Sequence, residues 1–241
     1  MLNEFWLALG FLTTLPTKTV PYPPDGLGRA GRWFPAVGLF LGLLLTVLYT
    51  LSALWFTPAI TAVLVIILWA ALTGGLHLDG LADCCDGLLA SAPRERRLEI
   101  MRDPRLGAFG VIGLVLALLL KAATVMALGN PLPALLLAPV WARWFILWAA
   151  RQPPARPGGL GNAFAASLTP AIVAQALILP VLVGVTAIYV DWHSLLAVMV
   201  AALVAFGVIR LAQARIGGVT GDLFGTVVEL AEITILLVLA R

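Results

Sequence analysis

Residues 33–78 read WFPAVGLFLGLLLTVLYTLSALWFTPAITAVLVIILWAALTGGLHL, and this stretch contains no Asp, Glu, Lys or Arg. A helix that spans a bilayer needs about 20 mainly apolar residues, so the stretch is long enough for two such helices. Proline disrupts the interior of a helix but is tolerated in its first turn. The stretch therefore predicts two membrane-spanning helices, with the break at Thr57-Pro58.

The composition of the whole chain places it in the same class. Of its 241 residues, 61% are hydrophobic and 11% are charged, and the mean hydropathy is +1.03. Soluble domains carry about 45–50% apolar and about 25% charged residues, and disordered chains have the opposite bias. Cys84 and Cys85 are adjacent, so they form neither a disulfide framework nor the spaced ligand set of a zinc site. We therefore expect an integral membrane protein.

Further apolar runs raise the number of candidate spans to seven. The spans cover residues 33–57, 58–78, 107–128, 132–150, 171–190, 194–211 and 223–240. The apolar segment 3–15 is too short to cross a bilayer at about 1.5 Å per residue, so we expect an interfacial or re-entrant helix there. Residues 1–241 are thus predicted to form one all-α, multi-pass membrane domain.

The distribution of basic residues predicts the orientation of these spans. Twelve of the 15 Lys and Arg residues lie before the first span or in the connections that follow the second, fourth and sixth spans. The connections on the opposite side contain none. Because Lys and Arg favour the cytoplasmic side, the N-terminus is expected in the cytoplasm. No basic stripe with interleaved aromatic residues indicates a nucleic-acid partner.

The first of two acidic clusters follows the second span, in the sequence GGLHLDGLADCCDG at 74–87. Asp79, Asp83 and Asp86 have i, i+4, i+7 spacing, which places them on one face of a helix. Three like charges on one face repel one another unless a cation lies between them. Carboxylate oxygens suit Mg²⁺, which proteins usually bind through one or two carboxylates together with substrate phosphates. This cluster therefore predicts a magnesium site.

The second acidic cluster begins the last span with the Gly-rich sequence GGVTGDLFG, in which the acid is Asp222. Glu229 and Glu232 follow on the same helical stripe. A carboxylate at membrane depth costs about 2.5–3.5 kcal/mol on insertion scales, so such residues face a cavity or a partner. Two interpretations stay open for the glutamates: they line a substrate site, or they join helices by pairing with Lys121 or Arg143.

Groups that could bind phosphate are expected on the same side of the membrane. Thr220 precedes the last span in a Gly-rich loop, where free backbone N–H groups could bind an anion. The connection after the second span contains MRDPRLGAFG at 101–110. The preceding Arg94, Arg96 and Arg97 are interpreted as topology-setting charges. Carboxylates for a metal ion and arginines for phosphates together predict group transfer involving a phosphorylated substrate.

The motifs resemble those of one family, the cobalamin-5′-phosphate synthases, also called adenosylcobinamide-GDP ribazoletransferases. The likeness runs nearly end to end, and its most specific part is the block HLDGLAD within residues 74–87. It includes the segment 101–110 and the loop around Asp222, together with FLTTLP at 11–16, RWFPAVG at 32–38 and GGLG at 158–161. One departure is Thr14, where many relatives are expected to carry arginine. Arg102 stands where lysine is expected and keeps the positive charge.

The resemblance implies a Mg²⁺-dependent bacterial membrane enzyme that completes the lower ligand of cobalamin, vitamin B12. Its substrates would be adenosylcobinamide-GDP and α-ribazole or α-ribazole 5′-phosphate. Its products would be adenosylcobalamin, or the 5′-phosphate, and GMP. The implied location is the cell inner membrane with the active site on its cytoplasmic side, and a homo-oligomer is an open possibility.

The residues singled out above and the implied reaction together lead to a hypothesis for the mechanism. Mg²⁺ would be held by Asp79, Asp83, Asp86 and Asp222, while the ribose 3′-hydroxyl of ribazole attacks the phosphorus nearest cobinamide. His77 or a carboxylate such as Asp83 would take the hydroxyl proton, since a neutral imidazole with a pKa of about 6.5 suits a base near neutrality. The residues expected to contact phosphate or substrate are Arg32, Arg102, Asp103, Arg105, Thr220, Glu229 and Glu232.

Two alternatives come from other functional classes. Another Mg²⁺-dependent diphosphate transferase, of the CDP-alcohol phosphotransferase or prenyltransferase type, would also place spaced aspartates at the cytoplasmic face. The order Asp-x-x-x-Asp-x-x-Asp-Gly does not fit the Asp-x-x-Asp-Gly-x-x-Ala-Arg pattern of the CDP-alcohol enzymes. A cation carrier would instead place its acids near the bilayer midplane on interrupted helices, whereas the first cluster here lies in a polar segment.

Overall fold

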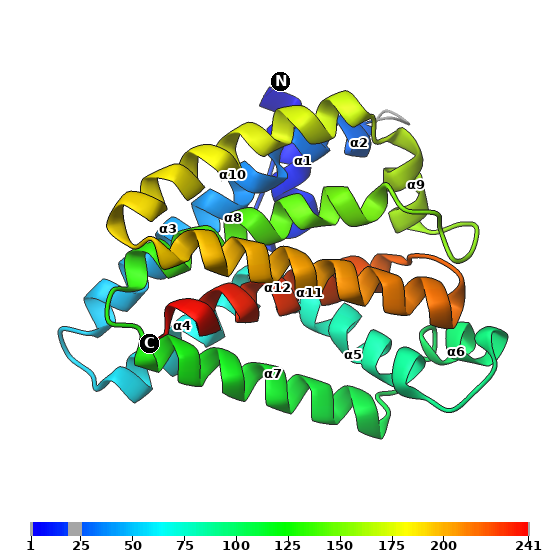
Figure 1. Cartoon of the computed structure of the whole chain (residues 1–241), viewed down its shortest axis with the longest axis horizontal. Helices are drawn as coiled ribbons and strands as arrows, with labels where there is room; N and C mark the ends of the chain where they lie inside the picture. The colour runs from blue at the N-terminus through cyan, green and yellow to red at the C-terminus, as the bar shows by residue number, and fades with distance from the viewer. Residues whose placement is uncertain (1, 19–25, 241) are drawn as a thin grey trace.

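The computed structural model describes residues 2–18 and 26–240, and within these ranges it contains helices and no β-strand (Figure 1). In chain order the helices are α1 (Leu2–Leu12), α2 (Gly26–Ala30), the 3₁₀ turn η1 (Gly31–Trp33), α3 (Phe34–Ser52), α4 (Pro58–Thr73), α5 (Leu76–Leu89), α6 (Arg94–Ile100), α7 (Ala108–Ala127), α8 (Pro131–Ala150), α9 (Leu160–Ser167), α10 (Pro170–Val190), α11 (His193–Ile216) and α12 (Gly221–Leu239). The predicted all-α class is confirmed.

Five helical segments are long and apolar enough to cross a membrane: the continuous stretch Gly26–Ser52, α7, α8, α10 and α11. The bent pair α4 and α5 can supply a sixth. A helix lies at each of the seven predicted positions, but α4 has only 16 residues and α12 carries three acidic side chains. Length and composition therefore support a multi-pass protein with five or six spans, where the sequence predicts seven. The short apolar helix expected near the N-terminus is α1.

The bend between α4 and α5 measures 90° and occurs at two glycines. Gly74 and Gly75 have φ angles of 59° and 70°, a left-handed conformation that side chains with a Cβ rarely adopt. The segment after α1 covers the exposed end of α4, because the Thr14 N–H donates to Leu72 O at 2.8 Å and its hydroxyl donates to Ala71 O at 2.9 Å. The carbonyl groups left free at the helix end are thereby satisfied.

Helix α12 lies in the interior of the bundle, where it packs against α5, α7, α8 and α11 (Figure 1). Its side chains Val227, Val228, Ala231 and Ile235 are fully buried. Because α12 is covered on several sides, Glu229 and Glu232 are buried, with exposed fractions of 3% and 0%. Each of them therefore requires a partner within the protein or a cavity.

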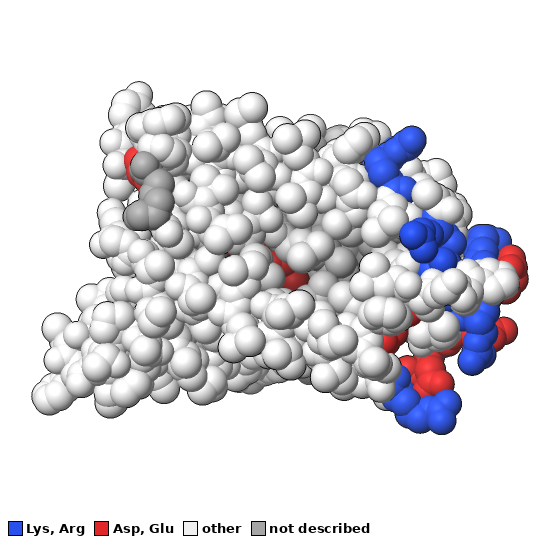
Figure 2. Space-filling model, turned by 60° about the horizontal axis from the view of Figure 1, so that its bottom comes forward, with Lys and Arg blue, Asp and Glu red and all other residues white. Residues whose placement is uncertain are grey.

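Charge is concentrated at one end of the molecule. Figure 2 shows Lys and Arg gathered there with acidic residues among them, while most of the face in view carries no charge. Figure 1 places α6 and the α11–α12 connection at this end and the α10–α11 connection at the other. The basic connections predicted to share one side of the membrane therefore do lie together. That this side is cytoplasmic stays a prediction.

Candidate active site

The candidate site is built where α5 and α12 cross at close range. A Cβ atom added to Gly80 would lie 2.6 Å from the carbonyl oxygen of Asp222, and one added to Gly225 would lie 2.9 Å from the carbonyl oxygen of His77. The Thr226 hydroxyl donates across the same crossing to Gly80 O at 3.0 Å. Small residues thus let two helix backbones touch. The first turns of both helices, which carry the acidic motifs, are held side by side.

A first cavity, here called the inner hollow, opens beside this crossing and has a volume of about 290 Å³. Phe11, Phe164, Phe224 and Ile146 supply apolar walls. The ring centroids of Phe164 and Phe224 are 6.4 Å apart with the planes at 76°, so the rings form an edge-to-face corner. Such a lining suits a flat, largely apolar ring system.

The polar side of the inner hollow is formed by Asp79, Asp222, Thr220, Arg156 and Asn162. Thr220 caps α12 by accepting a hydrogen bond from the backbone N–H three residues further on at 3.3 Å. Asn162 donates through Nδ2 to the carbonyl oxygen of Arg156, which ties α9 to the preceding loop. The inner hollow therefore combines an apolar wall with a rim of charged groups from three separate segments.

A second cavity, the outer hollow, has a volume of about 750 Å³. It is lined by the bend glycines and by Asp79, Asp83, Arg102, Asp103 and Arg105. Asp79 lines both hollows. The carboxylates of α5 and α12 therefore lie at the junction of an aromatic chamber and a wider, more charged one.

The junction concentrates negative charge with cations on its rim. Asp83 is half-buried and lies within electrostatic range of Asp79, Asp86 and Asp222. On the other side, Arg156 Nη2 is 3.6 Å from Asp222 Oδ2. Burial lowers the pKa of Arg156 below its ordinary value, and a nearby guanidinium, that of Arg102, lowers it further. Two guanidinium groups that disfavour each other's charge are suited to share an anion such as a phosphate.

Asp103 and Arg105 form a pair at the rim of the outer hollow. Arg105 donates through Nη2 to Asp103 Oδ2 at 2.7 Å and through Nε to Oδ1 at 2.9 Å. These bonds lower the pKa of Asp103 to about 2, so its carboxylate stays ionised at any physiological pH. Asp103 therefore orients Arg105, whose exposed side chain lines the outer hollow.

His77 lies in the first turn of α5 and lines the inner hollow. The side chain is only 3% exposed, and its Nε2 has no hydrogen-bond partner among the described residues. His77 therefore borders the cavity with an imidazole nitrogen that no described protein group satisfies. The position agrees with the predicted role of His77 as a base, although that role stays a prediction.

Asp86 contacts an adjacent helix in the structure, and the metal ligation that its spacing predicts stays a prediction. Its two carboxylate oxygens accept hydrogen bonds from the N–H groups of Gly107 and Gly110, both at 2.8 Å. A carboxylate at this place satisfies donors that the first turn of α7 leaves free. Asp86 lines neither the inner nor the outer hollow. The helical stripe is real, but its third acid is occupied by an adjacent helix.

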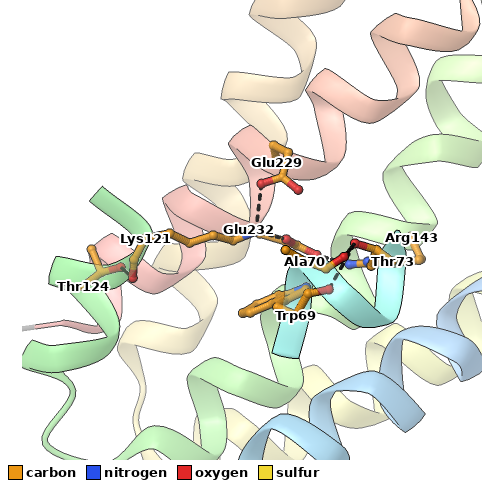
Figure 3. Close-up of polar contacts among 8 residues, drawn as sticks. All are labelled: Trp69, Ala70, Thr73, Lys121, Thr124, Arg143, Glu229 and Glu232. Atoms are coloured by element: carbon orange, nitrogen blue, oxygen red, sulfur yellow. Dashed lines mark hydrogen bonds and ion pairs between the residues drawn. The ribbon is translucent and has the colours of Figure 1, made fainter. Parts of the chain in front are cut away.

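Glu229 and Glu232 do not line either hollow, so the structure favours the second interpretation offered for them (Figure 3). Lys121 Nζ lies 2.8 Å from Glu229 Oε2 and 2.5 Å from Glu232 Oε2, and Arg143 Nη1 contacts Glu232 Oε1. All four side chains are buried. Because a buried charge needs a close counter-charge, these glutamates are held by cations of α7 and α8 instead of by substrate.

Arg32 is also placed away from both hollows. It lies in η1, where its Nε donates to Arg29 O at 3.1 Å and is 3.8 Å from Glu4 Oε2. Neither cavity is lined by Arg32. Arg32 therefore lies apart from both hollows, and its contact with substrate stays a prediction.

The carboxylates at the junction allow a test of the predicted magnesium site. Among the residues that the structure describes, no group of three or more His, Cys, Asp or Glu side chains is arranged to hold a metal ion by itself. Asp222 Oδ2 is nevertheless buried without a hydrogen-bond partner, and Asp79 and Asp83 share the outer hollow. This donor set fits Mg²⁺ when substrate phosphates supply further oxygens, which is the usual way proteins bind it.

The structure adds site residues that the motifs did not single out. Arg156, Asn162 and the aromatic residues Phe11 and Phe164 line the inner hollow from segments far from the acidic motifs. The sequence signals were present, since GGLG at 158–161 and FLTTLP at 11–16 belong to the motifs quoted above. Neither segment is acidic, so a search for metal ligands passes over both.

Comparison with known proteins gives a consistent result. A family model described as cobalamin-5-phosphate synthase matches residues 4–240. A protein of Brevibacillus brevis named adenosylcobinamide-GDP ribazoletransferase is 35% identical over 99% of this chain and 98% of its own length. A protein of the same name from Pseudomonas fluorescens strain Pf-5 is 42% identical over 97% of this chain and 97% of its own length. Another from Roseiflexus sp. is 39% identical over 95% of this chain and 86% of its own length. No solved structure matches the chain.

Proposed function

The chain belongs to the cobalamin-5-phosphate synthase family, and we propose that it transfers α-ribazole, or its 5′-phosphate, onto adenosylcobinamide-GDP. The products are adenosylcobalamin, or its 5′-phosphate, and GMP. The observation that carries the proposal is the position of Asp79, which lines both the aromatic inner hollow and the wider outer hollow. A transferase for two large substrates needs two chambers that meet at the reacting groups.

We assign one substrate to each chamber. The base of ribazole is a benzimidazole, a flat and mostly apolar ring that fits walls made by Phe11, Phe164 and Phe224. The outer hollow is larger and carries Arg102 and Arg105, so it receives the diphosphate of the bulkier substrate. With this arrangement the ribose of ribazole faces the carboxylates at the junction.

The reaction is a displacement at phosphorus. The ribose 3′-hydroxyl oxygen forms a bond to the phosphorus nearest cobinamide, the bridging P–O bond of the diphosphate breaks, and GMP leaves with that oxygen. The hydroxyl proton passes to the imidazole of His77, a residue that lines the inner hollow. Arg102 and Arg156 bind phosphate oxygens and balance the charge that develops on them.

Asp79, Asp83 and Asp222 would hold Mg²⁺ at the junction. When bound, this ion would neutralise charge on the diphosphate and stabilise the leaving oxygen. Because the carboxylates repel one another without a cation, binding of the metal is favoured. The substrate phosphates would supply the remaining oxygen ligands of the metal. The reaction would take place at the cytoplasmic face of the inner membrane, where the basic connections are expected.

The test is an assay of purified protein in detergent with Mg²⁺, adenosylcobinamide-GDP and α-ribazole 5′-phosphate. We expect GMP and a cobalamin product in equal amounts, both abolished by EDTA and restored by added Mg²⁺. Asp83→Asn should remove turnover, whereas Glu99→Gln, at a carboxylate that is 64% exposed on α6, should not. Absence of product from folded wild-type protein would refute the proposal.

The assignment of chambers has its own readout. Phe164→Ala enlarges the inner hollow and removes an aromatic wall, so it should raise the KM for ribazole phosphate while changing the KM for adenosylcobinamide-GDP much less. An equal or larger rise in the second KM would show that the chambers are assigned the wrong way round.

A further inference from the structure

A cluster of four charged side chains lies in the middle of the bundle (Figure 3) and lines neither hollow. Lys121 comes from α7, Arg143 from α8, and Glu229 and Glu232 from α12. Their exposed fractions range from 0% to 3%. We call these four residues the buried ion cluster.

The buried ion cluster contains two cations and two anions, which interlock. Glu232 lies at its centre, because its two oxygens contact different partners, Lys121 and Arg143. Lys121 also contacts Glu229 and lies 4.3 Å from the centre of the Trp69 ring on α4. Nε and Nη2 of Arg143 have no hydrogen-bond partner among the described residues. Glu232 therefore connects α7 and α8 through α12.

Holding helices together with such a cluster carries a large free-energy cost of desolvation. Apolar side chains would bury the same surface without the desolvation of four charges, and replacing buried ion pairs by apolar residues is often neutral or stabilising. What ion pairs add is geometric selectivity, because their energy changes steeply with distance in a medium of low dielectric constant. An apolar helix surrounded by apolar neighbours loses little when it rotates or slides slightly.

The position of the cluster on α12 shows what this selectivity controls. Glu229 and Glu232 are seven and ten residues after Asp222, so all three lie on one stripe of the helix. Any rotation or axial shift of α12 that moves the two glutamates moves Asp222 as well. One turn after Asp222, Thr226 donates to Gly80 O at the crossing with α5.

We propose that the four residues of the buried ion cluster are positioning residues that fix the rotation and depth of α12, and so hold Asp222 beside Asp79 at the junction of the hollows. The geometric part of this proposal is independent of the reaction. Its consequence for turnover rests on the proposed function.

The geometric part is tested by disulfide cross-linking between α5 and α12. The side chains of Cys84 on α5 and Thr226 on α12 line the same cavity and interact with each other, so Thr226→Cys places two thiols next to each other. Cys85→Ala removes the competing thiol. The rate of the 84–226 disulfide, formed with a membrane-permeant oxidant and quantified by mass spectrometry of the linked peptides, reports the register of the two helices.

The informative variant in this background is Arg143→Gln combined with Glu232→Gln. It removes one cation and one anion, keeps the Lys121–Glu229 pair, and leaves no unpaired buried charge. We expect the double variant to fold and to cross-link several times more slowly. Glu232→Asp keeps both charges but shortens the carboxylate arm, so its rate should lie between the two. Cross-linking at the reference rate in both variants would overturn the proposal.

The kinetic part uses the same substitutions with the natural Cys84, Cys85 and Thr226. Because a shift of about 1 Å at reacting groups can reduce a rate by a factor of about 100, kcat should fall roughly 10- to 100-fold in the double variant. Both KM values should change much less, and Glu232→Asp should restore part of kcat. Unchanged kcat with slower cross-linking would mean that Asp222 does not act in turnover, which refutes the proposed function of that residue but not the geometry.

Discussion

Substitution of Gly80 by alanine tests the crossing of α5 and α12 on which the candidate site depends. The added Cβ would lie 2.6 Å from the carbonyl oxygen of Asp222 and 3.1 Å from its Cα. Ordinary van der Waals contact begins near 3.4 Å, so the helices would have to separate locally by roughly 0.8 Å. Both atoms belong to backbone, and no side-chain rotation can relieve the contact.

Two effects of different size are expected from this separation. Overpacking of a close helix contact costs about 1–3 kcal/mol of stability, which leaves most of the protein folded under assay conditions. The same movement displaces Asp222 relative to Asp79 by a distance comparable with the 1 Å that reduces a rate by a factor of about 100. We therefore expect kcat to fall roughly 10- to 100-fold, a larger effect than the loss of folded protein can explain.

The assay measures GMP release alongside thermal unfolding in detergent, with Gly207→Ala as the matched control. Gly207 lies on α11, where an added Cβ meets no atom within 4 Å. Alanine favours a helix over glycine by about 1 kcal/mol, so the control should have normal turnover and equal or higher stability. Normal turnover and stability in Gly80→Ala would refute the close crossing as the device that places the carboxylates.

Two further predictions concern residues at the charged end. Arg97 is buried and donates to Gly87 O at 3.1 Å and to Leu88 O at 2.6 Å, so Arg97→Ala should lower the free energy of unfolding by about 1.5–3 kcal/mol. The control is Arg96→Ala, because the Arg96 side chain is 65% exposed and paired with Glu99. Its loss should cost less than about 1 kcal/mol. Equal melting temperatures for the two variants would contradict this. Asp86→Ala leaves two N–H groups of the α7 terminus without their acceptor and should cost about 1–2 kcal/mol. The protein that remains folded should keep its turnover. Complete loss of activity below the melting temperature would show that Asp86 takes part in the reaction.

Several features of the protein can be predicted from local sequence alone. The uncharged stretch 33–78 is sufficient for membrane helices, because the bilayer selects on length and hydropathy. The block at 74–87 places Asp79, Asp83 and Asp86 on one face of α5, because helical spacing depends only on the backbone. The grouping of the basic connections at one end also follows from the sequence, because every second connection between membrane spans lies on the same side.

The roles within each acidic stripe depend on neighbours that helical periodicity does not describe. Asp83 and Asp86 are equivalent members of one stripe, yet Asp83 lines the outer hollow while Asp86 accepts two N–H groups from α7. Asp222 and Glu232 likewise share a stripe, but the first lines the inner hollow and the second contacts Lys121 and Arg143. Asp86 and Glu232 interact with the donors or cations nearest to them, and helix packing decides which carboxylates have such a neighbour.

The sequence by itself thus determined the helical class, the membrane environment and the residue types available for chemistry, since these depend on composition and on the 3.6-residue period. Only the tertiary structure decided the 90° bend after α4, the crossing at Gly80 and the partners of each buried charge. It also brought Phe11, Phe164 and Arg156 to the carboxylates from remote segments. The physical reason is that burial, close contact and charge pairing act between elements far apart in the chain, where short-range patterns carry no information.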